Sequence, residues 1–162
     1  MTMPLLSSSY STSNKHKPWI RKARIGDIPS VYQIEERSFK DPYSPLLLMK
    51  FLALYPYGFF AAEEAGKIIG YAIFREVAQK GHIIAIAVEE GHRRRSIGTQ
   101  LLKKAMDVFR QRGAVGVWLE VRVSNLQAQR FYMDRGFERM TTVRGYYEDG
   151  EDAEIFYRTV SS

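Results

Sequence analysis

The segment HRRRSIGTQLL, residues 92–102, places three consecutive arginines directly before the start of an amphipathic helix. The first turn of a helix exposes unpaired backbone N–H groups and the positive end of the helix dipole, and phosphate groups bind there readily. Arg93, Arg94 and Arg95 would add positive charge, and Gly98 would let a ligand approach the backbone closely. The pattern indicates a pyrophosphate-binding loop, although a basic helix cap facing solvent would have the same composition.

Two side chains in predicted strands could move protons. Glu120 lies within WLEVR, where strand alternation places it on the same face as Trp118 and Arg122. A carboxylate in a half-buried strand needs an ion-pair partner, such as Arg122, or a chemical role. His82 opens the apolar strand HIIAIAV and could relay a proton or simply form the polar end of the strand. With three scattered histidines and no cysteine, the sequence lacks metal-ligand spacing, so we expect no metal.

The hydrophobic pattern predicts elements in the order β-α-α-β-β-β-α-β-α-β-β. Predicted helices cover 26–39, 46–55, 92–114 and 124–136, and predicted strands cover 19–25, the two halves of 57–77 around a turn at 65–66, 82–88, 115–123, 137–147 and 152–160. Asp27 is the expected N-cap of the first helix, and Ser124 with Gln127 forms a capping box for the last. The order predicts an α+β domain with a mixed, mainly antiparallel sheet.

Length and composition narrow the class of protein. The chain has 162 residues and a net charge of +6, which suits one soluble domain that favours anionic partners. Residues 1–17 have a Ser-rich composition without an apolar signal core, so we expect a disordered tail followed by a single domain over 18–162. No apolar run is long enough to span a bilayer, and the absence of cysteine excludes disulfides. We therefore expect a cytoplasmic protein with no membrane partner.

Three segments, in order, resemble the GNAT superfamily of acetyl-CoA-dependent N-acetyltransferases. The first is Arg93-Arg94-Arg95-Ser96-Ile97-Gly98, which is similar to the family motif Arg/Gln-x-x-Gly-x-Gly/Ala, with Ser96 where a glycine is usual. The others are LEVRVSNLQAQRFYMDRGF (119–137) and RGYYEDGEDA (144–153). Together they resemble the branch of protein N-terminal acetyltransferases, which includes the ribosomal-protein alanine acetyltransferase and the archaeal and eukaryotic N-α-acetyltransferase catalytic subunits. The resemblance covers about residues 19–160 and implies a seven-stranded GNAT sheet flanked by about four helices.

The resemblance implies acetyl-CoA as the co-substrate. In the family, an asparagine binds the pantetheine arm, a tyrosine faces the thiol, and a backbone N–H on the fourth strand stabilises the oxyanion; Asn125, Tyr132 and the region of Ala87 and Val88 stand at these positions. The residues that the resemblance assigns to the co-substrate are Ala87, Val88, Arg93, Arg94, Arg95, Ser96, Ile97, Gly98, Thr99, Asn125 and Tyr132.

The implied reaction is acetyl transfer to the α-amino group of a protein N-terminus by direct attack in a ternary complex. The amine must be neutral to attack, and its pKa near 8 makes a modest base or a water chain sufficient. Glu120 and His82 compete for this role, and water could link the proton to either. Tyr132 is the candidate acid for the departing thiolate, although a tyrosine on an apolar helix face is often a core residue.

Two segments resemble the loops that flank the incoming peptide. FKDPYS supplies Phe39, Asp41 and Tyr43 on one side, and GYYEDGED supplies Tyr146 and Tyr147 on the other. Tyrosine hydroxyls can bind peptide backbone while the rings pack against side chains. Asp41 could attract a cationic amine or cap the next helix, and the two adjacent tyrosines could instead pack a strand near a turn.

Other functions stay open at this point. The acceptor could be a lysine side chain, a polyamine or another small amine; the protein could be a basic module that binds RNA or the ribosome; or it could bind CoA without turnover, which Ser96 makes conceivable. The sequence shows no RNA-binding pattern of aromatic and basic residues on a strand, so we expect no specific nucleic-acid partner. The expected partners are protein or peptide N-termini, with ribosome association, and the expected state is a monomer or weak dimer.

Overall fold

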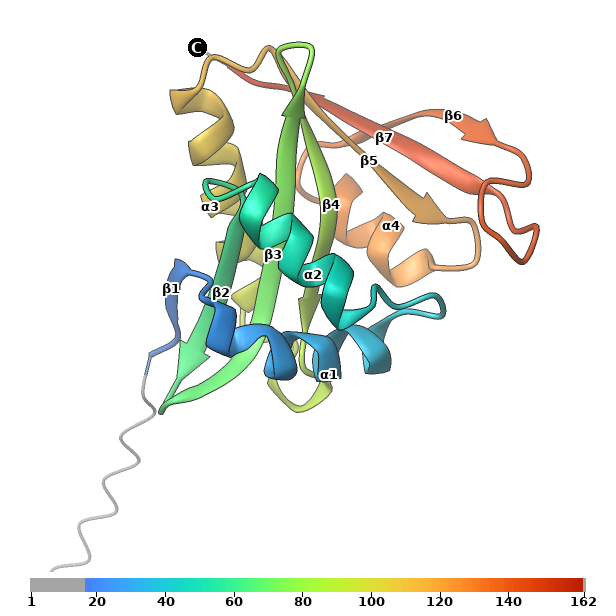
Figure 1. Cartoon of the computed structure of the whole chain (residues 1–162). Helices are drawn as coiled ribbons and strands as arrows, with labels where there is room; N and C mark the ends of the chain where they lie inside the picture. Colours follow the sequence, from blue (N-terminus) through green and yellow to red (C-terminus); the bar gives the residue numbers. More distant parts are fainter. Residues whose placement is uncertain (1–16, 162) are drawn as a thin grey trace, which may run out of the picture.

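One seven-stranded sheet organises residues 17–161, the part of the chain that this computed structural model describes (Figure 1). The strands lie in the order β1-β2-β3-β4-β5-β7-β6. Their bounds are β1 Trp19–Lys22, β2 Phe59–Glu64, β3 Lys67–Val77, β4 Lys80–Val88, β5 Gly116–Arg122, β6 Glu138–Val143 and β7 Ala153–Thr159. The predicted mixed, mainly antiparallel sheet is confirmed, whereas the predicted tail lies, except for residue 17, outside the described residues.

Helices cover both faces of the sheet. Their bounds are α1 Ile28–Ser38, α2 Pro45–Leu54, α3 Ile97–Gln111 and α4 Leu126–Met133. Figure 1 shows α1 and α2 in front of the sheet and α3 and α4 behind it, and a separate buried cluster lies on each side. None of the helices between residues 17 and 161 has the length and apolar character that a membrane crossing requires.

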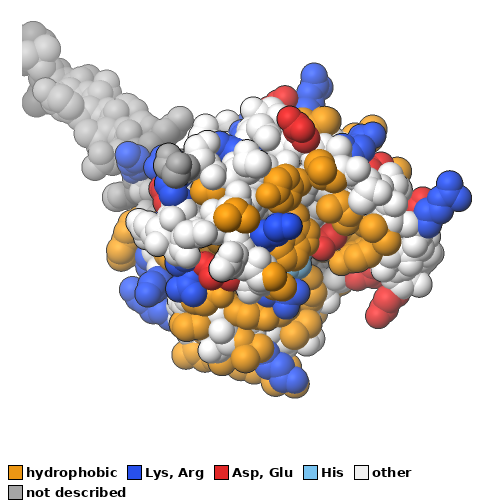
Figure 2. Space-filling model, turned by 90° about the horizontal axis from the view of Figure 1, so that it is seen from above, with side chains coloured by type: hydrophobic (Ala, Val, Ile, Leu, Met, Phe, Trp, Pro, Cys, Tyr) orange, Lys and Arg blue, Asp and Glu red, His pale blue; other side chains and the backbone are white. Residues whose placement is uncertain are grey.

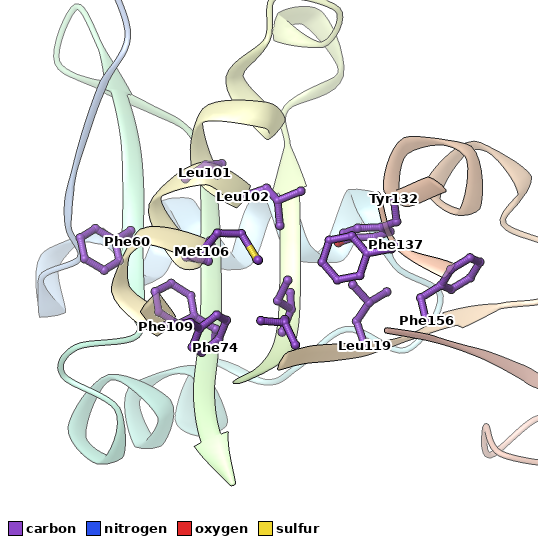
Figure 3. Close-up of a cluster of buried hydrophobic side chains, with 14 of the residues drawn as sticks. Phe60, Phe74, Leu101, Leu102, Met106, Phe109, Leu119, Tyr132, Phe137 and Phe156 are labelled. Carbon is purple, nitrogen blue, oxygen red and sulfur yellow. The ribbon is translucent and has the colours of Figure 1, made fainter. Parts of the chain in front are cut away.

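The larger core cluster joins α3 and α4 to the sheet (Figure 3). α3 presents a continuous apolar stripe because its buried residues recur at helical spacing. Phe109 of this stripe packs edge-on against Phe74 of β3, with ring centroids 5.0 Å apart. Farther along the sheet, Tyr132 of α4 makes a similar contact with Phe137 at 5.5 Å. This packing fixes both helices, and therefore their N-terminal turns, relative to the strands.

β4 and β5 stay paired over only a short distance. In the described part of the chain they form the one parallel pair of neighbouring strands, because α3 crosses over between them. The ladder contains only Gly81 opposite Val117 and His82 opposite Trp118. A Cβ on Gly81 would lie 2.7 Å from the Phe109 ring, so this close packing requires glycine. Beyond this point the two strands diverge, as Figure 1 shows, and leave an opening in the middle of the sheet.

The start of α3 contains a residue in an unusual conformation. Ser96, the N-cap, has φ 63° and ψ 15°, in the left-handed region that L residues other than Asn and Asp seldom adopt. Its side chain makes no capping hydrogen bond. The left-handed backbone conformation at this position explains why the resembled motif usually has a glycine there. In this chain a serine adopts that conformation.

Local details at other element ends differ from the predictions. Asn125, rather than Ser124, caps α4, and its side chain accepts from the Ala128 N–H at 3.1 Å. The capping-box prediction was wrong because the Ser124 hydroxyl bonds to Glu151, a residue far along the chain. β6 ends at Val143, so the segment predicted as strand up to residue 147 instead forms the start of a loop over 144–152. Asp27 occupies the N-cap of α1, but its side chain makes no capping bond to that helix.

Glu35 of α1 is fully buried between that helix and the sheet, with only 1% of its surface exposed. Its Oε1 accepts a hydrogen bond from the Tyr43 N–H at 3.0 Å, and the Tyr71 hydroxyl donates to Oε2. Burial raises the pKa of Glu35 to about 7, against the opposing effect of the Tyr43 N–H. This carboxyl group therefore ties α1 to the loop before α2 and to β3.

The raised pKa of Glu35 predicts a pH-dependent stability. Between its usual pKa of 4.5 and about 7, the folded protein binds more protons than the unfolded chain, so the Glu35 contribution to stability falls as the pH rises. Glu35→Gln cannot titrate, so from pH 5 to pH 8 its stability should rise relative to wild type by at most about 3 kcal/mol. Urea unfolding at both pH values measures this. The exposed neighbour Glu36→Gln is the control, and a pH-independent difference for Glu35→Gln would contradict the prediction.

The left-handed conformation of Ser96 predicts that Ser96→Gly stabilises the protein. Removing Cβ relieves the conformational cost, and the greater freedom of glycine in the unfolded chain offsets part of the gain, which leaves about 0.5–1 kcal/mol. Ser96→Ala keeps Cβ and loses only the hydroxyl, so it should not stabilise. Thermal unfolding of the two variants and wild type measures the difference, and equal effects of Gly and Ala would rule out backbone strain as the cause.

Candidate active site

A cavity of about 610 Å³ occupies the opening between the diverging strands. Its walls include residues 83–88 of β4, residues 119–122 of β5, the start of α3, the inner side of α4 and two loops, 39–44 and 144–152. Segments that are far apart in sequence therefore meet around one volume. Residues 17–161 contain no cluster of three or more histidine, aspartate or glutamate side chains suited to a metal ion.

The basic segment before α3 reaches this cavity in part. Arg93, Arg94, Ser96, Ile97, Gly98 and Thr99 line it, together with the first turn of the helix. The Arg93 Nε donates to the Val88 carbonyl at 2.9 Å, which holds the loop against the end of β4. Arg95 is not among the lining residues, and its guanidinium pairs with Glu64 at 2.5 Å instead. Backbone N–H groups, the helix dipole and two arginines together suit a pyrophosphate.

Arg135, two residues beyond the end of α4, is a cavity residue that was not predicted from the sequence. Its Nε and Nη2 donate to the Thr99 hydroxyl at 3.0 and 2.6 Å, and its Nη1 donates to the Phe131 carbonyl at 2.8 Å. The guanidinium also lies 3.8 Å from the centre of the Phe131 ring. Arg135 thus adds positive charge beside the first turn of α3. The partner Thr99 is remote in sequence, so no local signal pointed to this contact.

Asn125 lines the cavity from the N-cap of α4. Because its Oδ1 accepts from the Ala128 N–H, the amide nitrogen is the group that can donate to a ligand carbonyl. The opposite wall is β4, and its edge toward β5 has no ladder beyond His82. The backbone of Ala87 and Val88 belongs to this edge and lines the cavity. Both observations fit the predicted contacts with a pantetheine arm and a developing oxyanion.

Tyr132 is both a core residue and a cavity residue, so the two interpretations of this tyrosine from the sequence are compatible. The residue is only 8% exposed and its ring packs against Phe131 and Phe137, so it is a core side chain. It also lines the cavity. Burial raises its pKa well above the usual value for tyrosine, which keeps the phenol protonated at neutral pH. A phenol that retains its proton can donate it to a departing thiolate.

Glu120 and His82 form a hydrogen-bonded pair across the point where β4 and β5 meet. His82 Nε2 and Glu120 Oε2 are 2.8 Å apart, and the Arg75 Nε donates to His82 Nδ1 at 3.2 Å. Since Nδ1 accepts, the hydrogen of a neutral ring lies on Nε2 and is donated to Glu120. Trp118 stacks on the His82 ring with a centroid distance of 4.6 Å. Glu120 lines the cavity, whereas His82 is not among the lining residues and contacts Glu120 from behind.

The expected ion pair between Glu120 and Arg122 is not what the structure shows. The Arg122 guanidinium contacts Asp41, Asp149 and Glu151, which belong to the two loops around the cavity. Asp41 therefore neither caps the following helix nor lies free. Ser44 caps α2 by accepting from the Leu47 N–H at 3.2 Å.

All five residues predicted to face a peptide line the cavity: Phe39, Asp41, Tyr43, Tyr146 and Tyr147. Burial raises the pKa values of Tyr43 and Tyr147 to about 12, so these hydroxyls stay protonated and can donate. The rings of Tyr146 and Tyr147 pack edge to face with centroids 4.9 Å apart, and Tyr146 remains 49% exposed. Tyr146 and Tyr147 therefore pack against each other near a turn and also line the cavity.

Comparisons with known proteins agree with this geometry. An uncharacterized N-acetyltransferase of Methanocaldococcus jannaschii is 41% identical over 140 residues, covering 86% of this chain and 90% of that protein. The N-alpha-acetyltransferase of Sulfurisphaera tokodaii is 35% identical over 160 residues, covering 90% and 96%. The [ribosomal protein bS18]-alanine N-acetyltransferase of Escherichia coli is 34% identical over 138 residues, covering 83% and 93%.

A solved structure has the same fold as this chain. The crystal structure of Ard1 from Thermoplasma volcanium superposes with a TM-score of 0.86 at 29% identity, covering 90% of this chain and 99% of that one. The model of the Acetyltransferase (GNAT) family matches residues 28–137. The chain therefore belongs to the GNAT family and is an N-acetyltransferase that uses acetyl-CoA as its co-substrate.

Proposed function

We propose that this enzyme acetylates the α-amino group of protein N-termini, with the amine and acetyl-CoA bound together. The observation that carries the proposal is the continuous cavity whose lining includes the first turn of α3, both loops over 39–44 and 144–152, and the side chains of Glu120 and Tyr132. Such a cavity provides an anion site, a proton acceptor, a proton donor and an aromatic wall in one volume. Relatives named for N-α-acetylation and for ribosomal-protein alanine acetylation support the same acceptor.

The chain would hold the co-substrate through a small set of groups. Arg93, Arg94 and the backbone at Ser96 to Thr99 would bind the pyrophosphate, and the Asn125 amide would donate to the pantetheine arm. Arg135 would add charge next to Thr99. Arg95, in its ion pair with Glu64, would contribute to the positive potential of the loop rather than by contact.

The proton steps follow from the side chains on the wall. The substrate nitrogen attacks the thioester carbon, a C–N bond forms and the C–S bond breaks. Glu120, directly or through a water, takes the proton that the amine releases, and His82 positions Glu120 through its Nε2 hydrogen. Tyr132 donates a proton to the leaving sulfur. A backbone N–H near Ala87 and Val88 stabilises the negative charge that develops on the carbonyl oxygen.

The proposal also includes a partner, the ribosome, and a cellular location. The α-amino acceptor includes nascent or ribosomal proteins, so weak association with the ribosome and a cytoplasmic location belong to the same proposal. A function as a nucleic-acid-binding module has less support. On the face in Figure 2, Lys and Arg side chains are dispersed and interleaved with Asp and Glu, and hydrophobic side chains gather in the middle of the view.

A lysine side chain or a small amine is the alternative acceptor, and one assay separates the candidates. Acetyl transfer from acetyl-CoA should occur on short peptides with a free N-terminus, in a panel that varies the first residue among Ala, Ser, Met, Leu and Glu. Peptides with a blocked N-terminus and a free lysine are the matched controls. Release of free CoA is the readout. Turnover on the blocked lysine peptides, or on polyamines alone, would contradict N-terminal specificity.

A further inference from the structure

Arg122, the last residue of β5, contacts both loops of the proposed peptide site. Its Nη1 lies 2.7 Å from Glu151 and 3.1 Å from Asp149, both in loop 144–152. Its Nη2 donates to Asp41 in loop 39–44. The guanidinium carbon lies 3.9 Å from the centre of the Tyr147 ring. One side chain therefore touches residues separated by about a hundred positions in sequence.

A second ion pair joins the two loops directly. Lys40 Nζ, in the first loop, lies 2.7 Å from Asp149 Oδ2, in the second. Within the second loop, the Glu151 N–H donates to Asp149 Oδ1 at 3.1 Å. The N–H of Ser124, which follows β5, donates to Glu151 Oε1 at 3.0 Å. These bonds connect the tip of loop 144–152 to the end of β5 and to loop 39–44 by polar contacts.

We propose that Arg122 is a positioning residue that joins loops 39–44 and 144–152 into a clasp across the cavity, and that this clasp sets the affinity for the peptide substrate. The clasp is defined here as Lys40, Asp41, Arg122, Asp149 and Glu151. The inference rests on the proposed function for its substrate, but the contact between the loops can be measured without turnover.

The location of the clasp argues for a role in binding rather than in chemistry. Lys40, Asp41 and Arg122 line the cavity, as do Tyr43, Tyr146 and Tyr147 on the two loops. Glu120, the proposed base, makes its hydrogen bond to His82 and not to Arg122. Loosening the clasp should thus separate the aromatic walls that hold a peptide and leave the proton path and the acetyl-CoA site in place.

Two members of the clasp are exposed, which makes their ion pairs sensitive to salt. The side chains of Lys40 and Asp41 are 65% and 48% exposed, so dissolved ions screen their charges. Single exposed ion pairs contribute little, but Arg122 shares one guanidinium among three carboxylates, and a network of several charges is a case in which surface ion pairs do contribute. We therefore expect the KM for peptide to rise with ionic strength in wild type more steeply than in a variant that lacks Arg122.

The test uses Arg122→Met and Arg122→Lys in the full chain. Arg122→Met should raise the peptide KM about tenfold, with kcat and the Kd for acetyl-CoA changed less than about twofold, and Arg122→Lys should lie between it and wild type. Amide hydrogen exchange should accelerate in both loops of Arg122→Met, a readout that needs no activity. Unchanged exchange in either loop would overturn the clasp, whereas a wild type inactive on all peptides would overturn only the proposed substrate.

A matched control and a double-mutant cycle separate the clasp from general destabilisation. Arg112 makes contacts of the same kinds, 2.6 Å from Glu76 and 3.8 Å from the centre of the Tyr57 ring, although it is more exposed and pairs with a single carboxylate. None of these three residues lines the cavity. Arg112→Met should leave the peptide KM unchanged. Asp41→Asn should raise KM in wild type but have little effect in Arg122→Met, because the ion pair of Asp41 is with Arg122. Additive effects in the two backgrounds, or an equal effect of Arg112→Met, would contradict the proposal.

Discussion

The short parallel contact between β4 and β5 is the constraint on which the rest of the site depends. Two residue pairs hold the strands together, and beyond them neither strand edge has a ladder partner in the other. An opening in a sheet leaves backbone groups that need hydrogen bonds, and an extended substrate can supply them. The crossover helix α3 produces the parallel pairing and also places its own N-terminal turn at the opening. The divergence of the strands and the position of the proposed anion site therefore have one topological origin.

The two faces of the sheet contribute different residues to this opening. On one face, α3 and α4 are fixed by an apolar core and present the helix start, Asn125 and Tyr132. On the other, the loop before α2 is anchored from below by Glu35 and from the side by Arg122. The hydrogen-bonded pair of Glu120, the proposed base, and His82 lies next to the point where β4 and β5 are paired, so its geometry is set by strand pairing rather than by a loop.

Periodicity was enough to predict the element order, and the resemblance to the GNAT family implied many of the residues that line the cavity. Helix and strand patterns depend on neighbours in sequence, and the basic segment before α3 is a local signal. Contacts between remote residues were not accessible in this way. The pairing of Arg95 with Glu64, of Arg135 with Thr99 and of Arg122 with three loop carboxylates depends on tertiary placement. The wrong cap at Ser124 has the same cause, because Glu151 competes for its hydroxyl.

We propose that the opening brings Glu120 to the attacking amine, and single-turnover acetyl transfer by Glu120→Gln tests this role most directly. The amide is nearly isosteric but cannot take a proton. We expect the rate constant for transfer to a saturating peptide to fall by about 100-fold, the scale of general base catalysis, while the Kd for acetyl-CoA stays within about twofold of wild type. An unchanged rate constant with intact acetyl-CoA binding would contradict the account and assign the proton to another route.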